Sequence, residues 1–192
     1  MVAEAVAGGV DWIQLRERDL DGRALCELAD RVVAAARRAA GAAGRPVRVL
    51  INRRADVALA TGADGVHLGW NALPVAAARA LLGAGAIVGV AAHTPEELRA
   101  AATSGADYAT LAPICRPLSK PAARAPLGIA AIEKCAGDLP VLAQGGIDAS
   151  NAAQAIRAGA AGVAVTGAIL SARDPRAAAA ALRAALDGLA SF

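Results

Sequence analysis

The sequence has few of the residues that characterise nucleic-acid-binding, membrane and disulfide-bonded proteins. Aromatic residues make up only 2% of its 192 residues, and its formal net charge of +3 is not gathered into a basic run. No stretch of about 18 uninterrupted apolar residues occurs, and no leader peptide is recognisable. The three cysteines lack a CxxC spacing and predict neither a disulfide framework nor a zinc site. We therefore expect a cytoplasmic protein that binds neither nucleic acid nor a membrane.

Apolar residues, by contrast, make up 56% of the chain, which is enough for a single domain over residues 1–192. Short apolar runs alternate with alanine-rich helical stretches, and they lack the strict alternation of half-exposed strands. We predict seven parallel strands, at Trp12–Arg16, Val47–Asn52, Gly65–Leu68, Ile87–Ala92, Tyr108–Pro113, Val141–Ala143 and Val163–Val165.

A glycine stands at four of the joints between a predicted helix and the next strand, namely Gly9, Gly62, Gly105 and Gly159. Glycine in the left-handed conformation ends a helix and returns the chain to the sheet. This repetition favours an α/β fold of the TIM (β/α)8-barrel type over an open sheet. Because the sequence opens with the tail of a helix, we expect a barrel without its first strand. The first and last predicted strands would then face each other across a gap.

Two turns of small residues follow the last two predicted strands. They are Gly145-Gly146 and Thr166-Gly167-Ala168. Backbone N–H groups of two neighbouring turns can close on one anion, as the last loops of βα barrels often do. The alternative is that the glycines only permit tight turns. We predict a phosphate site here.

Polar residues follow the other predicted strands, at the end where active sites of βα barrels lie. The candidates for this mouth are Gln14, Arg16, Arg18, Asn52, Arg53, His67, His93, Ser119 and Lys120. The set includes both histidines of the chain. A histidine at a strand end can also be a buried structural residue, so this alternative stays open for each of them.

Six collinear motifs cover nearly the whole chain. They read GGVDWIQLRERD (Gly8–Asp19), LINRRADVALATGADGVHLGWNALP (Leu50–Pro74), VGVAAHTPEEL (Val88–Leu98), GADYATLAPICRPLSK (Gly105–Lys120), VLAQGGI (Val141–Ile147) and GVAVTGAI (Gly162–Ile169). With these motifs the sequence resembles the thiamine phosphate synthase superfamily, which also contains the TenI-like thiazole tautomerases. The resemblance implies a TIM barrel, relative to which this chain is truncated at its N-terminus.

The resemblance also implies roles for residues of the mouth. It places Gln14 near a pyrimidine ring and gives the pyrophosphate contacts to Arg16, Arg18, Asn52 and Lys120. It assigns the thiazole phosphate to the turns at Gly145, Gly146, Gly167 and Ala168. We add Arg53, His67, Ser119 and Thr166 to the substrate-binding candidates because they lie in the same segments.

Two of the departures from the family pattern concern a metal site. Where the family has the carboxylates that hold Mg²⁺, this sequence has Arg53 and Ala72, and neither can bind a hard cation through oxygen. We therefore expect no metal site and no cofactor, with Mg²⁺ needed only if the protein is a synthase. The alternative for Arg53 is a surface ion pair with Asp56 or Asp19.

Three functions follow from this pattern. The first is a metal-independent thiazole tautomerase, an isomerase acting on a thiazole phosphate carboxylate, with His93 as the proton shuttle. The second is a thiamine phosphate synthase, which joins hydroxymethylpyrimidine pyrophosphate to thiazole phosphate, with Arg53 supplying part of the charge of Mg²⁺. The third is a non-catalytic barrel that binds a phosphate ligand. In each the partner is a small phosphate compound, and a homo-oligomer is compatible with all three.

Overall fold

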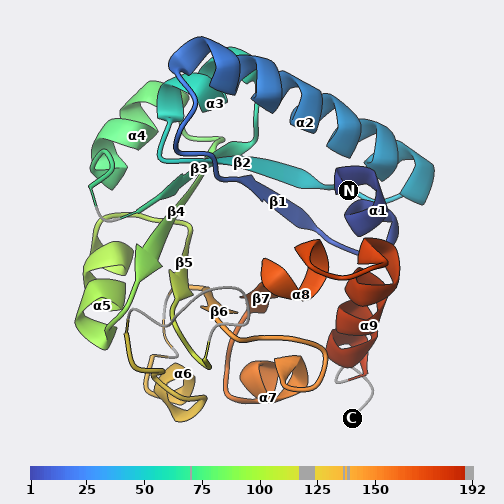
Figure 1. Cartoon of the computed structure of the whole chain (residues 1–192). Coiled ribbons are helices and arrows are strands. Elements are labelled where there is room, and N and C mark those ends of the chain that lie inside the picture. Colours follow the sequence, from blue (N-terminus) through green and yellow to red (C-terminus); the bar gives the residue numbers. More distant parts are fainter. Residues whose placement is uncertain (70, 117–123, 136, 138, 189–192) are drawn as a thin grey trace.

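The computed structural model describes residues 1–69, 71–116, 124–135, 137 and 139–188. Its strands form one parallel sheet in which every neighbour in space is a neighbour in sequence, in the order β1 to β7. The sheet is curled and the helices lie around its outer side, so the chain has the fold of a TIM-type barrel (Figure 1).

The seven strands lie where the apolar runs predict them, with ends that differ by one or two residues. Their bounds are β1 (Trp12–Leu15), β2 (Arg48–Asn52), β3 (Gly65–Leu68), β4 (Ile87–Ala92), β5 (Tyr108–Leu111), β6 (Val141–Gln144) and β7 (Gly162–Ala164). The glycines predicted to end helices, Gly9, Gly62, Gly105 and Gly159, all have positive φ. These joints therefore form as the sequence indicates.

Helices connect the strands. Their bounds are α1 (Val2–Ala7), α2 (Gly22–Ala43), α3 (Ala55–Thr61), α4 (Val75–Leu82), α5 (Pro95–Thr103), α6 (Ala130–Glu133), α7 (Ala152–Arg157), α8 (Gly167–Leu170) and α9 (Pro175–Asp187). Asp21, Thr94 and Asp174 cap α2, α5 and α9 by accepting a backbone N–H of the first turn. Within the described ranges, none of these helices has the length and apolarity needed to span a lipid bilayer.

Alternate residues of each strand face the helices or the inside of the curled sheet. The outward side chains of β3, β4 and β5, such as Val66, Val88 and Leu111, are buried against the helices. The strand register aligns four inward residues in one row, namely Asn52, His67, Gly89 and Tyr108. This row crosses β2 to β5 and leads to the candidate site.

The two ends of the sheet, β1 and β7, are not hydrogen-bonded to each other in the part of the chain that the structure describes. The expected gap is therefore present. The outer layer nevertheless continues across it, because α1 packs on both α2 and α9 (Figure 1). Arg183 of α9 donates to Asp11, which lies just before β1, over 3.0 Å.

Candidate functional site

Three polar residues lie at the same level on the first three strands. Asn52 ends β2 and is paired in register with His67 of β3. Arg16 directly follows β1, whose last residue Leu15 is paired with Ile51 of β2, so Arg16 lies beside Asn52. Asn52 is only 8% exposed and His67 only 5%, whereas Arg16 is exposed. The register thus places an arginine, an amide and an imidazole side by side near the carboxyl ends of the strands.

His67 is held by Tyr108, an aromatic residue that the sequence does not single out as a candidate for the site. Its Nδ1 atom lies 2.9 Å from the Tyr108 hydroxyl oxygen, and the Tyr108 ring in turn meets Trp12 edge-on, with centroids 5.1 Å apart. A Cβ atom at Gly89 would overlap the Tyr108 ring, so glycine is required on β4 between the two partners. The inside of the sheet is therefore packed around this pair.

The surroundings of His67 decide its charge. Burial lowers the pKa of His67 to about 4, with a further contribution from the charge of Arg16. Burial also raises the pKa of Tyr108, so the phenol keeps its proton and is hydrogen-bonded to Nδ1 of a neutral imidazole. In a neutral imidazole one ring nitrogen donates and the other accepts, so His67 has one donor and one acceptor.

Three arginines gather at the mouth, Arg16, Arg18 and Arg53. Burial lowers the pKa of Arg16, and the charges of Arg18 and Arg53 lower it further. Arg53 donates from Nη2 to the carbonyl of Asn71 over 3.3 Å. The proposed surface pair with Asp56 is not formed, because Asp56 is paired instead with Arg54. The mouth is therefore strongly cationic.

The glycine turn after β6 is shaped by the neighbouring loop. Gly145 and Gly146 both have positive φ, and a Cβ at Gly146 would lie 2.7 Å from Cβ of Cys115 and would also overlap the carbonyl oxygen of Arg116. The carbonyl of Gly145 accepts from the N–H of Cys115, and that of Gly146 accepts from the Asn151 side chain. Glycine is thus required here by contacts within the protein.

The register of Gln144 with Ala164 places this turn next to the one that contains Thr166, Gly167 and Ala168. Thr166 is the exposed N-cap of α8 and makes no capping bond with its side chain. Within the described residues, the N–H groups of Gly145, Gly146, Gly167 and Ala168 are not used as donors. The turns are compatible with the predicted anion, whose presence stays a prediction.

His93 follows β4 and is half-buried. Its backbone N–H donates to Oε2 of Glu97 over 2.6 Å, and its Nδ1 atom lies 3.2 Å from the same oxygen. Both contacts fix His93 to the first turn of α5, which Thr94 caps. The structure therefore ties His93 to α5, and among the described residues His93 forms no hydrogen bond with Asn52 or His67.

The remaining predicted residues differ in how well they can be placed. Gln14 lies on β1 and is exposed. Ser119 and Lys120 lie outside the described residues. Sequence reasoning missed Tyr108, Gly89 and Asn71, because these contacts depend on strand register and on the path of a loop.

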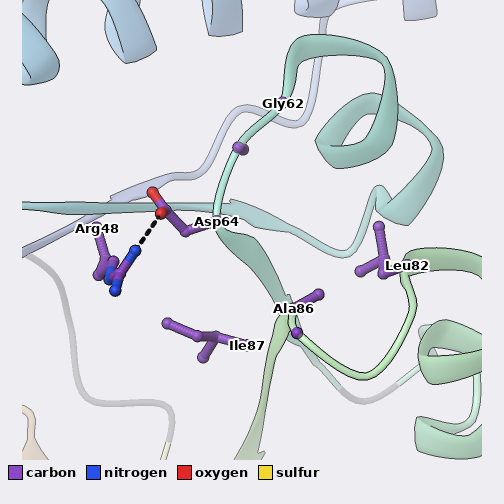
Figure 2. A pocket seen from close by; sticks show the side chains of 8 residues that line it. Arg48, Gly62, Asp64, Leu82, Ala86 and Ile87 are labelled. Carbon is purple, nitrogen blue, oxygen red and sulfur yellow. Dashed lines mark hydrogen bonds and ion pairs between the residues drawn. The ribbon is translucent and has the colours of Figure 1, made fainter.

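A hollow of about 320 Å³ lies at the opposite end of the strands (Figure 2). Residues at the start of β2, β3 and β4 line it, and its polar groups, Arg48 and Asp64, are joined by an ion pair of 2.9 Å. Active sites of barrels lie at the carboxyl ends of the strands, whereas contacts at this end stabilise the fold. The mouth with Arg16 is thus the candidate site.

Residues 1–169 match the sequence profile of the thiamine monophosphate synthase family. The chain belongs to this family. It is 46% identical over 188 residues to the putative thiamine-phosphate synthase of Geobacter sulfurreducens, covering 97% of this chain and 85% of the relative. It is 44% identical to the thiamine-phosphate synthase of Chlorobium luteolum, with 97% and 86% covered. The solved thiamine phosphate pyrophosphorylase of Pyrococcus furiosus is 29% identical, with a TM-score of 0.86 over 98% of this chain and 88% of that chain.

These relatives correct one expectation. The interpretation as a thiazole tautomerase is wrong, because relatives at 46% and 44% identity over almost the whole chain are named thiamine-phosphate synthases. That interpretation rests on the absence of two carboxylates at the mouth, and it gives this local change more weight than the similarity of the remaining motifs. The chain is a member of an enzyme family of thiamine biosynthesis.

The two positions at which the resemblance implies carboxylates for Mg²⁺ carry side chains of a different kind in this chain. The Arg53 guanidinium lies against the loop that carries Ala72, because it donates to the carbonyl of the preceding residue, Asn71. Among the described residues, no group of three His, Cys, Asp or Glu side chains is arranged to hold a metal ion. The donor set at these positions does not fit Mg²⁺, and the expectation that no cofactor is needed stays a prediction.

Proposed function

We propose that the protein is a thiamine-phosphate synthase, which joins hydroxymethylpyrimidine pyrophosphate to thiazole phosphate. The observation that carries this proposal is the alignment of Arg16, Asn52 and His67 at the ends of three neighbouring strands. It gives an anionic substrate one cationic group and two hydrogen-bonding groups on one wall of the mouth. The names of the relatives support the same reaction.

The proposed reaction exchanges one bond for another. The bond between the methylene carbon of the pyrimidine and a diphosphate oxygen breaks, and the oxygen keeps the electron pair. The lone pair of the thiazole nitrogen forms the new bond to that carbon, so the nitrogen becomes positively charged and no proton is released. Negative charge therefore grows on the departing diphosphate, where arginine side chains stabilise it most.

The residues of the mouth divide between the two substrates in this proposal. Gln14 contacts the pyrimidine, while the diphosphate lies between Arg16, Arg18 and Asn52. In this proposal His67 donates from Nε2, in the tautomer whose Nδ1 accepts from the Tyr108 hydroxyl 2.9 Å away. The thiazole phosphate lies at the glycine turns, and Ser119 and Lys120 complete the proposed set. His93 has no part in it, because its role as a shuttle belonged to the tautomerase reaction.

The test is the formation of thiamine phosphate from the two substrates, followed by chromatography. We expect turnover by the wild-type protein, and a loss of about ten- to a hundredfold in kcat/KM for Arg16→Ala, the range for a hydrogen bond to a charged group. Arg31→Ala removes an exposed arginine from α2 and should leave the rate unchanged. Binding of thiazole phosphate without any product would contradict the synthase and favour a non-catalytic barrel.

A further inference from the structure

None of the ion pairs between described residues includes Arg16, Arg18 or Arg53. Like charges that converge without carboxylates repel one another, and burial and this repulsion both lower the pKa of Arg16. Such a cluster is stabilised by a ligand with several negative charges.

Arg53 is held in a backbone conformation that is unfavourable for arginine. Its φ is 65°, and among the described residues it is the only non-glycine residue with positive φ. Asparagine, aspartate and glycine adopt this conformation more readily than arginine does. The N–H of Arg53 donates to the carbonyl of His67 over 2.8 Å, which fixes the start of the side chain at the rim between β2 and β3.

The neighbouring Arg54 shows how an ordinary surface arginine behaves at this end of β2. It binds Asp56 through both Nε and Nη2, at 2.8 and 2.6 Å. Arg53 instead reaches the Asn71 carbonyl with a single N–H, so most of its five donors are not used by the described residues. The two adjacent arginines thus have different surroundings, and Arg53 directly follows Asn52, beside which the strand register places Arg16.

We propose that the Arg53 guanidinium, together with Arg16 and Arg18, binds the diphosphate of the substrate directly and takes the place of a divalent cation. The inference rests on the proposed function, because it concerns the group that leaves in that reaction. A guanidinium can hold two diphosphate oxygens in a bidentate pair. When the methylene–oxygen bond breaks, the electron pair stays on the diphosphate, whose added charge these three groups then balance.

The first experiment measures binding of inorganic pyrophosphate by calorimetry in EDTA. The wild-type protein should bind it, and Arg53→Asn should weaken binding by about ten- to a hundredfold. Asparagine is chosen because it tolerates positive φ, so the variant removes the charge without disturbing the backbone. Arg54→Ala is the matched control and should bind as the wild type does. Binding by the wild type only after addition of Mg²⁺, or equal affinities of the two variants, would overturn the proposal.

The second experiment separates this inference from the proposed function. Formation of thiamine phosphate is measured in EDTA and in excess Mg²⁺ with the same protein. Equal rates in both buffers support the role of Arg53, whereas product formed only with Mg²⁺ contradicts that role and leaves the synthase intact. If no product forms in either buffer while pyrophosphate binds in EDTA through Arg53, the synthase fails and the diphosphate site remains.

Discussion

Three residues that are far apart in the sequence surround or position His67. The Tyr108 ring fits here because Gly89 leaves space for it, and its hydroxyl is hydrogen-bonded to Nδ1 of the imidazole. Arg16 lies close enough to oppose a positive charge on the histidine. A neutral imidazole in this place can donate to an anionic substrate without depending on pH near neutrality.

We expect this neutral state to appear in the pH dependence of stability. The unfolded chain protonates His67 near its ordinary pKa of about 6.5, while the folded protein resists protonation until about pH 4. The neutral state of His67 therefore contributes fully to the free energy of unfolding above pH 6.5. This contribution is lost as the pH falls toward 4, at about 1.4 kcal/mol per pH unit. Urea unfolding between pH 7 and pH 5 should show this loss in the wild type and not in His67→Gln.

Proton NMR gives an independent measurement of the same pKa. The chain has two histidines, so the C–H resonances of its imidazoles are few, and His67→Gln assigns them. The resonance that disappears in this variant should have a midpoint near pH 4 in the wild type. A midpoint near 6.5 would show that the imidazole is solvated and that neither burial nor Arg16 lowers its pKa.

At this scale the sequence predicts which residues face the mouth, and it predicts their partners poorly. Asn52 is found because it ends an apolar run, and His67 because it is a polar residue at the second-last position of one. Tyr108 is missed because it starts its strand and becomes a neighbour of His67 only through the register with Gly89. For Arg53, the charge indicates an anion site, but the choice between Asp56 and Asn71 depends on backbone conformation.

At the scale of the elements, two of the joints between helices and strands contain an aspartate that stabilises the joint in addition to the glycine. Asp64 precedes β3, and its carboxylate accepts the N–H of Val49 on β2 over 2.7 Å. Asp107 precedes β5 and accepts the N–H of Val88 on β4 over 2.6 Å. Each carboxylate also binds an arginine, Arg48 and Arg79 respectively. Each aspartate thus fastens its joint to the start of the preceding strand.

We expect Asp107→Ala to lower the free energy of unfolding by about 1–3 kcal/mol, because it leaves the N–H of fully buried Val88 without an acceptor. The ion pair with Arg79 adds little, since pairs this exposed contribute roughly 0–1 kcal/mol. Glu27→Ala, which removes an exposed pair with Arg23 on α2, is the control and should change stability by less than about 1 kcal/mol. Equal effects of the two substitutions in urea unfolding would show that the buried N–H does not matter.

The sequence indicates these joints only in part. Their repetition reveals the glycines, because a left-handed glycine has one evident purpose at the end of a helix. The aspartates stand at the same spacing in three of the four joints, but their acceptor role depends on the preceding strand, whose bonded residue lies 15 or 19 residues earlier. Long-range pairing of this kind becomes visible only once the register is known.

For the whole molecule, the seven strands and the gap between β1 and β7 are predicted because each βα unit is local in sequence. The reaction is not predicted correctly, because it depends on a few side chains at the mouth. The substitutions at Arg53 and Ala72 favour the tautomerase, while the other motifs favour the synthase. The outer helices show a further point that the sequence does not reveal. Contacts of α1 with α2 and α9 join the two ends of the sheet.

Gly8, which follows α1, permits a close approach to α9. A Cβ atom there would lie 2.7 Å from Cβ of Ala179 on α9 and would overlap the carbonyl oxygen of Arg176. Its φ of −80° is allowed for alanine, so any loss of stability in Gly8→Ala comes from crowding between the helices.

We expect Gly8→Ala to lower the free energy of unfolding by about 1–3 kcal/mol, the usual effect of overpacking. The matched control is Gly41→Ala on α2, where a Cβ atom meets nothing within 4 Å, and alanine there should raise stability by about 0.5–1 kcal/mol. Urea unfolding of both variants measures the difference. If Gly8→Ala were as stable as Gly41→Ala, α1 could move away from α9 freely, and the contact between them would not be what holds β1 and β7 together.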